Sequence, residues 1–417
     1  MIFSVKDYGA KGDGKTLDTN AIQACIDACA NAGGGRVLLE GGVFLSGTIR
    51  LASRVDFHVD GSAVLLGSPN CADYPKPEKL RHIDPKGCAR GNAACFIFAE
   101  EAENLSLSGT GRIDCNGEHF VRRDPNGRAW KPYVRINFDT PPRVVFLTGC
   151  RHVRIEDLAV VNPPAGWSYW IHDCDDVCMT RLRVDANVEY PNNDGIHINC
   201  SRDVTVSDCN IKSSDDSIIV RANSASLPEN KVCERISVTN CNLSSRTGAI
   251  RLGWINDGVV RNCSFSNLVI TDSRNGIFIT LPDKKTVVPD EGREESVIEN
   301  ITFDNIIMDR IHSHPIRIGI AEAKTSRVRV KSIAKLYFRG IRCRGLEFPS
   351  VEGSESCKLR EIGFEDCVFE KENRTKEYGE AVDHREEYKT VELFGDTLFS
   401  HTESITLNNV RFVDSTT

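Results

Sequence analysis

Short alternating segments recur along this chain and constrain its fold more than any other feature of the sequence. The segments VRIEDLAV, VCMTRLRV, VTVSDCNI and ISVTNCNL begin at Val153, Val177, Val204 and Ile236, with separations of 24, 27 and 32 residues. Periods of about 20–50 residues are typical of solenoids. Each segment alternates with a period of two and is too short to bury one face by itself, so neighbouring segments must stack.

A second set of strand-like segments lies between the first. It contains DGIHI, DSIIV, GAIRL, NGIFI and HPIRI, with one isoleucine at the same place in each: Ile196, Ile218, Ile250, Ile277 and Ile316. Such a column of aliphatic side chains would fill a solenoid interior. The residues that follow the isoleucines are then expected to face outward: His197, Ile219, Arg251, Phe278 and Arg317. The sequence therefore predicts an all-β, single-stranded, right-handed parallel β-helix.

The segment before the repeats is expected to cap this β-helix with a short N-terminal helix. Residues 18–31 place apolar side chains at helical spacing, Asp18 or Thr19 can serve as N-cap, and Gly33–Gly35 ends the helix. We expect one domain over residues 1–417. Its parts are an N-terminal cap and first rungs (1–93), central rungs with the catalytic cleft (94–370), and C-terminal rungs and cap (371–417).

Three polar or Pro/Gly-containing segments interrupt the rungs, at 116–142, 282–297 and 320–333. Because insertions in solenoids gather on one face, often the binding face, 116–142 and 282–297 are candidate walls of a cleft. The charged stretch 371–391 is expected to form a solvated loop or a short helix.

Composition narrows the class of protein. The formal net charge is −7 and like charges do not form long runs, which disfavours nucleic-acid binding. The sequence shows neither a signal peptide nor a long apolar span, so we expect a cytoplasmic protein without a membrane segment. The 17 cysteines are then expected to be mostly reduced and buried. No CxxC pair is present, so the usual zinc spacings are missing.

Three carboxylates lie at the start of two neighbouring segments of the second set. Asp194 lies in NNDG and Asp215–Asp216 in SSDDS; Asp194 and Asp216 each precede an aligned isoleucine by two residues. Adjacent rungs are about 4.8 Å apart, so the three carboxylates are expected to converge. Carboxyl groups that lie so near one another do not all ionise easily. This suits a reaction that needs one carboxylic acid and one carboxylate.

Two other interpretations of these aspartates remain open. Asp before a strand is often a turn residue that bonds its own backbone. Clustered carboxylates with backbone carbonyls also bind calcium. The aligned pair lies on the column that also carries outward His197 and Arg251, which is harder to explain by turns alone. We therefore expect a catalytic site, and we expect it to use no metal and no cofactor.

The chain resembles glycoside hydrolase family 28, the polygalacturonase-like enzymes that degrade pectin on a pectin-lyase-like β-helix. The similarity runs from YGAKGDG (Tyr8–Gly14) through GGGRVLLEGGVFLSGTIRL (Gly33–Leu51) to about residue 320. NNDGIHI, and the DD of SSDDSIIVRA that follows, resemble the family's NTDG and GDD motifs. The resemblance implies that Asp215 is the general acid, that Asp194 and Asp216 activate water, and that the anomeric configuration is inverted.

Other site residues follow partly from the resemblance. Asn192 matches the Asn of the first motif, and Arg221 lies where bacterial relatives often carry a basic residue. His197 follows Asp194 by three residues and is expected to contact the substrate or orient the acid. Trp167 and Trp170, one rung earlier, either pack a sugar ring or belong to the core.

The chain departs from the family pattern twice. The family's third motif carries His between two glycines, where this chain has Thr247 in SRTGAIRLG. Its fourth motif, Arg–Ile–Lys, grips the substrate carboxylate, whereas NGIFIT places Phe278 and Thr280 there. Phe278 cannot replace a bidentate Arg but offers an apolar surface to a sugar. Arg251, Arg221 and Arg317 are candidates to compensate for the lost cations, and Arg251 projects from the same column.

These observations predict an inverting glycoside hydrolase that acts on pectin-related oligo- or polysaccharides. An exo mode of action and a non-standard sugar at the cleavage subsite are both part of this prediction. Two alternatives stay open: a polysaccharide lyase or epimerase on the same fold, and a non-catalytic carbohydrate-binding β-helix. The oligomeric state does not follow from the sequence.

Overall fold

The structure, a computed structural model, describes residues 1–77, 79–84, 86, 88, 93–128, 131–136, 143–284, 295–323, 328–375 and 398–415. It consists of two compact units. The first contains Met1–Asp215 and Ala225–Pro228, and the second contains Asp216–Ser224 and Glu229–Thr417. Each unit is a stretch of right-handed parallel β-helix, as the sequence predicts. The expectation of a single domain stays a prediction.

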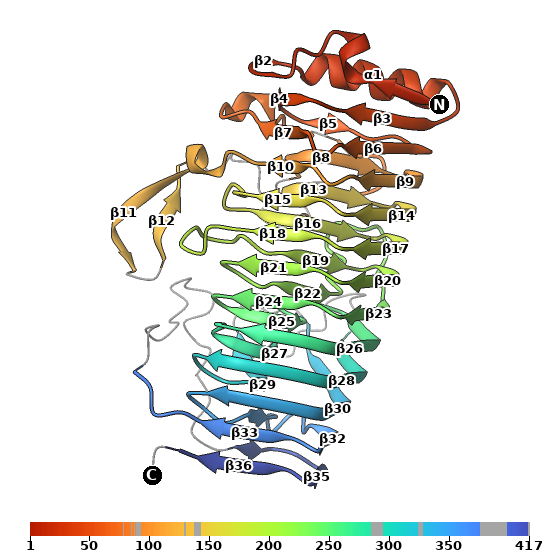
Figure 1. Cartoon of the computed structure of the whole chain (residues 1–417). Coiled ribbons are helices and arrows are strands. Elements are labelled where there is room, and N and C mark those ends of the chain that lie inside the picture. Colours follow the sequence, from red (N-terminus) through yellow and green to blue (C-terminus); the bar gives the residue numbers. More distant parts are fainter. Residues whose placement is uncertain are drawn as a thin grey trace. The chain divides into compact units, whose positions relative to one another are not determined.

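In the described part of the first unit, parallel strands stack in three columns (Figure 1). The first column is β1 (Ile2–Ser4), β3 (Gly35–Leu39), β6 (Val55–Val59), β9 (Glu103–Ser108), β14 (Arg151–Glu156), β17 (Asp175–Thr180) and β20 (Arg202–Ser207). The second is β2 (Asp13–Leu17), β4 (Gly42–Ser46), β7 (Ala63–Gly67), β10 (Arg112–Asp114), β15 (Ala159–Val161), β18 (Arg183–Asp185) and β21 (Asn210–Ser213). The third is β5 (Ile49–Arg50), β8 (Cys95–Glu100), β13 (Arg143–Thr148), β16 (Trp167–His172) and β19 (Ile196–Asn199).

The register of these strands confirms the repeat that was inferred from the sequence. Val153 pairs with Val177, which pairs with Val204, on successive parallel strands. All three valines are buried. Because side chains alternate across a strand, this register keeps one apolar column inside every rung.

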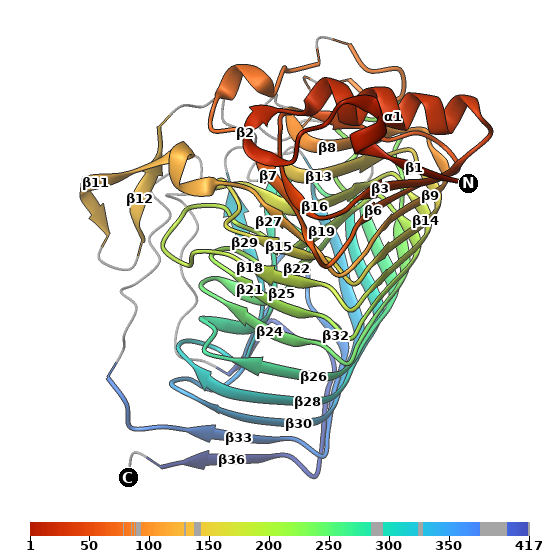
Figure 2. The same cartoon turned by 45° about the horizontal axis from the view of Figure 1, so that its top comes forward.

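Helix α1 (Thr19–Asn31) packs at the N-terminal end of the first unit, where Figure 2 shows it beside β1 and β3. Its apolar face buries Ile22 and Ile26, as expected for a cap. Asp18 is the N-cap residue, but its side chain makes no capping bond. Its carboxylate instead accepts hydrogen bonds from the backbone nitrogens of Lys11 and Gly12, at 2.8 and 3.0 Å, and so ties the YGAKGDG loop to the helix. Three short 3₁₀ helices, η1 (Val5–Tyr8), η2 (Cys71–Asp73) and η5 (Gly117–Phe120), complete the first unit's described helices.

The predicted insertion 116–142 contains an antiparallel hairpin of β11 (Val121–Arg128) and β12 (Lys131–Arg135). Figure 1 shows this hairpin projecting from the strand columns of the first unit. Residues 129–130 and 137–142 of the insertion lie outside the described residues.

The second unit continues the same architecture. One column contains β22 (Ile218–Arg221), β25 (Gly248–Leu252), β27 (Asn275–Lys284), β29 (Ile316–Ala323), β31 (Ser350–Glu352) and β34 (Phe399–Ser400). The remaining strands are β23 (Cys233–Thr239), β24 (Asn242–Ser245), β26 (Val259–Thr271), β28 (Ser296–Ile311), β30 (Val330–Gly345), β32 (Arg360–Glu365), β33 (Val368–Lys371), β35 (Ile405–Asn408) and β36 (Arg411–Asp414). Of the segments expected to be irregular, residues 285–294, 324–327 and 376–391 lie outside the described residues.

The interior of the second unit contains the predicted isoleucine column. Ile218, Ile250, Ile277 and Ile316 pair in register on successive strands and are completely buried. A second column stacks Phe265, Phe303, Phe338 and Phe364, with ring centroids 4.9–5.1 Å apart. Because successive rungs are evenly spaced, aromatic rings at the same position of each rung stack on one another along the column.

All 17 cysteines lie within the described residues, and all except Cys71 and Cys178 are buried. Burial raises the pKa of Cys25 and Cys95 to about 12, which keeps these thiols protonated and unreactive. Among the described helices, none has the length and apolar character needed to cross a membrane.

Candidate active site

Asp194 and Asp215 lie on two neighbouring turns of the first unit, just before β19 and just after β21. The backbone nitrogens of Ser214 and Asp215 both donate to the carbonyl oxygen of Asn193, each at 3.2 Å. Asp194 is 4% exposed, and the Asp215 side chain is 18% exposed. The fold therefore brings these two predicted carboxylates together, one buried and one accessible to solvent.

Asn193 links these turns to the preceding rung, and the sequence analysis missed it. Its Oδ1 accepts a hydrogen bond from the Gly166 nitrogen at 2.9 Å, and its Nδ2 donates to the Pro163 carbonyl at 3.3 Å. The side chain is completely buried. Its place in NNDG, directly before Asp194, was the only signal in the sequence that could have identified it.

Asn192 and Lys131 lie beside the Asp215 carboxylate within the first unit. Asn192 donates from Nδ2 to Asp215 Oδ2 at 3.2 Å, so the structure places this predicted residue at the site. Asn192 has a φ of 57°, in the left-handed region that Asn tolerates well. Lys131 Nζ lies 3.8 Å from the same carboxylate oxygen. Lys131 was not predicted as a site residue from the sequence, although it lies in the insertion that was expected to form a cleft wall.

The hairpin that carries Lys131 is anchored to the rungs beneath it. Arg135 donates from Nε to the carbonyl oxygen of Ala165 at 2.7 Å. Tyr133 packs edge-on against Tyr190, with ring centroids 5.1 Å apart, beside buried Val121. These contacts fix the base of the hairpin and, with it, the position of the ammonium group near Asp215.

His197 lies beside Asp194, with Nδ1 3.6 Å from Asp194 Oδ2. The residue leaves the interior column as predicted, since it pairs with Trp170 while Ile196 pairs with Tyr169. It is nevertheless almost completely buried, because the Trp167 ring stacks on it with a centroid separation of 3.8 Å.

The outward column above His197 is covered by a second apolar layer. Phe98, Phe146 and Trp170 pair in register on β8, β13 and β16, and all three are buried. The covering side chains come from the segment between β7 and β8, together with Leu227: Leu80, Ile83, Cys88 and Ala93. These strands of the first unit therefore present no open surface on which a polysaccharide could lie.

Asp216, the third predicted carboxylate, follows Asp215 in the chain and belongs to the second unit. Thr247 donates from Oγ1 to Asp216 Oδ1 at 2.9 Å, and Arg251 Nη1 lies 3.2 Å from Asp216 Oδ2. The side chains of Arg251 and Asp216 are 12% and 3% exposed. Thr247, at the place of the family's His, thus contacts a predicted catalytic carboxylate.

Arg251 is packed between aromatic rings. Its guanidinium carbon lies 3.9 Å from the ring centroid of Trp254 and 4.9 Å from that of Phe278, with which it pairs in register. A cation–π contact removed from solvent is worth about 2 kcal/mol. Phe278 therefore holds Arg251 in place against Asp216.

Gly248 allows this arrangement because of its missing side chain. A Cβ at Gly248 would lie 3.1 Å from Asp216 Oδ1 and 3.3 Å from the Cβ of Phe278. Any larger residue would push the carboxylate and the ring apart.

Arg221 forms a two-pronged ion pair within the second unit. Its Nε and Nη2 both donate to the carboxylate of Asp257, with Nε 2.9 Å from Oδ2. The same oxygen accepts a hydrogen bond from the backbone nitrogen of Trp254 at 2.9 Å. Arg221 therefore stabilises the loop that carries Trp254, while its predicted contact with substrate stays a prediction.

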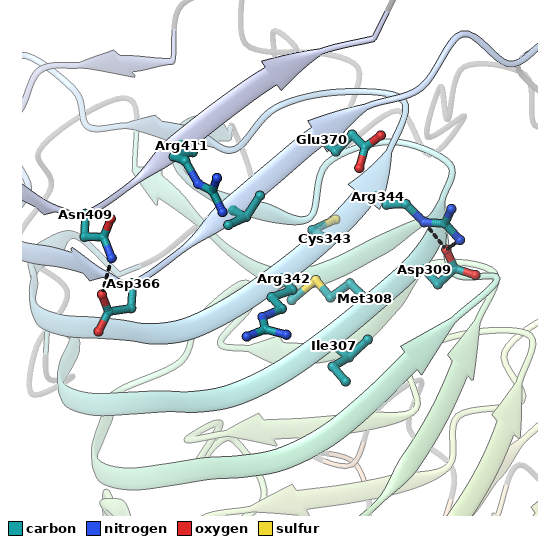
Figure 3. Close-up of a pocket in the computed structure, with 11 residues that line it drawn as sticks. Ile307, Met308, Asp309, Arg342, Cys343, Arg344, Asp366, Glu370, Asn409 and Arg411 are labelled. Carbon is teal, nitrogen blue, oxygen red and sulfur yellow. Dashed lines mark hydrogen bonds and ion pairs between the residues drawn. The ribbon is translucent and has the colours of Figure 1, made fainter.

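Two further features bear on alternative sites. Within the described part of the chain, no group of three or more His, Cys, Asp or Glu side chains is placed to hold a metal ion. A hollow of about 1100 Å³ in the second unit carries both Arg342 and Arg411 and the acidic Asp366 and Glu370 (Figure 3). This balanced charge favours neither an anion nor a cation, and none of the predicted site residues lines it.

Two protein-family models match the sequence of this chain. The family model described as Glycosyl hydrolases family 28 matches residues 84–361, well over half of the chain. A model described as Rhamnogalacturonase A/epimerase, pectate lyase-like, matches residues 2–76.

Similar individual proteins carry polygalacturonase names. A probable polygalacturonase of Vitis vinifera is 25% identical over 66% of this chain, which spans only 56% of that protein. An exopolygalacturonase of Arabidopsis thaliana is 25% identical over 82% of this chain and 72% of its own length. The crystal structure of an exopolygalacturonase from Thermotoga maritima superposes with a TM-score of 0.69 at 19% identity, covering 89% of this chain and 87% of that one.

Proposed function

Because the chain belongs to glycosyl hydrolases family 28, we propose that it hydrolyses pectin-related polysaccharides from a chain end, with inversion of the anomeric configuration. Asp215 protonates the leaving oxygen, and Asp194 and Asp216 deprotonate the attacking water. The different surroundings of Asp194 and Asp215 support this division of roles. The buried Asp194 is closed in by His197, whereas the Asp215 side chain keeps access to solvent and substrate.

The proposal of exo action rests on the covered aromatic column. Phe98, Phe146 and Trp170 occupy the strands directly before the rung that carries Asp194, and the segment between β7 and β8 buries them. Leu227 and Ser226 strengthen this cover, since Ser226 Oγ lies 2.7 Å from His172 Nε2 and Ser226 O accepts from the Asp84 nitrogen. A long polymer that met this cover would have to end there, so cleavage would occur near a chain terminus.

The direct experiment uses oligogalacturonides labelled at the reducing end. We expect short unlabelled sugars to appear first, with reducing groups released and no unsaturated product. Proton NMR of the first product should show the anomer opposite to that of the cleaved bond. Random internal cuts would overturn exo action, the same anomer would overturn inversion, and ultraviolet-absorbing unsaturated sugars would indicate a lyase. Binding without release of reducing groups would leave the non-catalytic alternative.

We also propose that the sugar at the cleavage subsite is not held as a free uronate by the family's usual cations. Phe278 and Thr280 occupy those places, and Phe278 packs against Arg251. Arg251 in turn is paired with Asp216. A carboxylate buried without a cationic partner costs several kcal/mol, so a neutral sugar, or one held differently, suits this surface better.

Matched oligogalacturonides test this proposal, one series with free carboxylates and one with methyl esters. We expect kcat/KM for the esterified series to equal or exceed that of the free series, because esterification removes the charge at little change in shape. A loss of about 100-fold on esterification, the value of a lost charge-assisted hydrogen bond, would show that a cation grips the uronate after all.

A further inference from the structure

Arg143 is a buried cation that the proposed chemistry does not use. It is the first residue of β13 and only 2% exposed. Its guanidinium carbon lies 4.1 Å from the ring centroid of Trp167 and 4.3 Å from that of Trp170. The two indoles are nearly perpendicular, at 84°, so the guanidinium fills the corner between them.

Trp167 contacts both an imidazole and a guanidinium. The imidazole of His197 stacks on it with a centroid separation of 3.8 Å and an interplanar angle of 28°. Arg143 lies over the same ring at 4.1 Å. Trp167, which is itself partly buried, therefore links Arg143 to His197.

Trp170, the other tryptophan considered in the sequence, is also enclosed. Phe146 stacks on it at 4.1 Å and Arg143 lies over it at 4.3 Å. Of the two roles that the sequence left open for these tryptophans, packing in the core is the role of Trp170, which is 3% exposed. What distinguishes Trp167 is that its packing partner is His197.

The backbone ties Trp167 to the turn that carries Asp194. Gly166 donates from its nitrogen to Asn193 Oδ1 at 2.9 Å, and Ser168 donates from its nitrogen to the carbonyl of Asp194 at 2.9 Å. The side chain of Trp167 thus supports His197 while the residues on either side of it fix the Asp194 turn. His197 Nδ1 lies 3.6 Å from Asp194 Oδ2, longer than a normal hydrogen bond. A small shift of the imidazole would change that contact.

We propose that Arg143 and Trp167 are positioning residues, which hold His197 in the orientation that sets the Asp194 carboxylate. This rests on the proposed function, in which Asp194 helps to deprotonate water. Neither residue touches the reacting atoms. Arg143 packs on Trp167, Trp167 stacks on the imidazole of His197, and the imidazole borders the Asp194 carboxylate. Misplacement of a catalytic group by about 1 Å can cost about 100-fold in rate, so a stack that prevents such a shift affects kcat more than KM.

The test compares Arg143→Met and Trp167→Phe with Phe98→Leu as a matched control. Phe98 belongs to the same buried cluster as Trp170. Its ring contacts the guanidinium of Arg50 at 4.9 Å and the ring of Phe146 at 5.5 Å, on the side of the stack away from His197. We expect kcat to fall about 10- to 100-fold in the first two variants, with KM changed less than about twofold. Phe98→Leu should lower the melting temperature while keeping kcat within about twofold of the original protein, and Arg143→Lys should recover part of the rate.

Histidine-selective NMR separates this inference from the proposed function. The His197 signal, assigned by its loss in His197→Gln, should shift in Arg143→Met and Trp167→Phe but not in Phe98→Leu. If the unsubstituted protein has no hydrolytic activity but the variants show this pattern of His197 shifts, the proposed function is wrong and the inference about positioning stands. Unchanged kcat and an unchanged His197 signal in folded Arg143→Met, or in Trp167→Phe if the first variant does not fold, would overturn the inference. An equal loss of kcat in Phe98→Leu would overturn it too.

Discussion

Replacing Asp215 with asparagine should lower kcat by about 10³-fold or more, near the upper range for general acid catalysis, while the melting temperature stays close to that of the original protein. Asparagine keeps the shape and can still accept the hydrogen bond from Asn192 Nδ2. The pair with Lys131 is long, at 3.8 Å, and both side chains are 18% exposed, so solvent limits what its loss costs. Steady-state kinetics and thermal melts on the same preparations measure both effects.

A substrate with an activated leaving group sharpens this experiment. An aryl glycoside whose phenolate departs without protonation no longer needs an acid. The loss in Asp215→Asn should therefore shrink with such a substrate, whereas the loss in Asp194→Asn should not. Equal losses on both kinds of substrate would assign Asp215 a role other than protonating the leaving oxygen.

Replacing Asp216 with asparagine should lower kcat about as much as Asp215→Asn does. It should also destabilise the protein, which Asp215→Asn should not. Asp216 accepts a hydrogen bond from Thr247 and is paired with Arg251, in a setting where both charged side chains are nearly buried. Breaking a buried pair by removing one partner costs about 3–5 kcal/mol, because the other charge stays buried without compensation. Asparagine retains part of the hydrogen bonding, so we expect the lower part of that range. The measurement is the midpoint of denaturant unfolding.

The double variant Asp216→Asn/Arg251→Met isolates the charge pair. Methionine keeps the packing between Trp254 and Phe278 and removes the uncompensated cation. The double variant should therefore be more stable than Asp216→Asn alone, yet remain inactive. If Asp216→Asn melts like the original protein, the pair with Arg251 is not a stabilising interaction in solution.

Regions where the chain repeats were predictable from the sequence, and the reason is local. The Val153–Val177–Val204 register and the isoleucine column through Ile250 follow from alternation with a period of two, because a slip by one residue would turn every buried side chain outward. The same periodicity located Asp194, Asp215 and Asp216 at the starts of strands. Their catalytic roles remain implied by the family motifs, and the variants above test them.

What the sequence left open concerns partners that come from distant segments. Arg221 and Arg251 were both candidates to replace the family's lost cations. Arg221 pairs with Asp257, 36 residues on, while Arg251 is held against Asp216 by Trp254 and Phe278. Periodicity predicts on which side of a strand a residue lies, but it does not predict which loop covers that side.

The sequence by itself determined the β-helix, its register and the three aspartates, because stacking of rungs depends only on the short-range alternation that each segment carries. The tertiary structure alone decided that Lys131 reaches Asp215 from a hairpin, and that Arg143 and His197 both pack on Trp167. These contacts depend on how insertions fold back over the rungs and on rings that meet across separate strands. Such packing is non-local, and no repeat in the sequence encodes it.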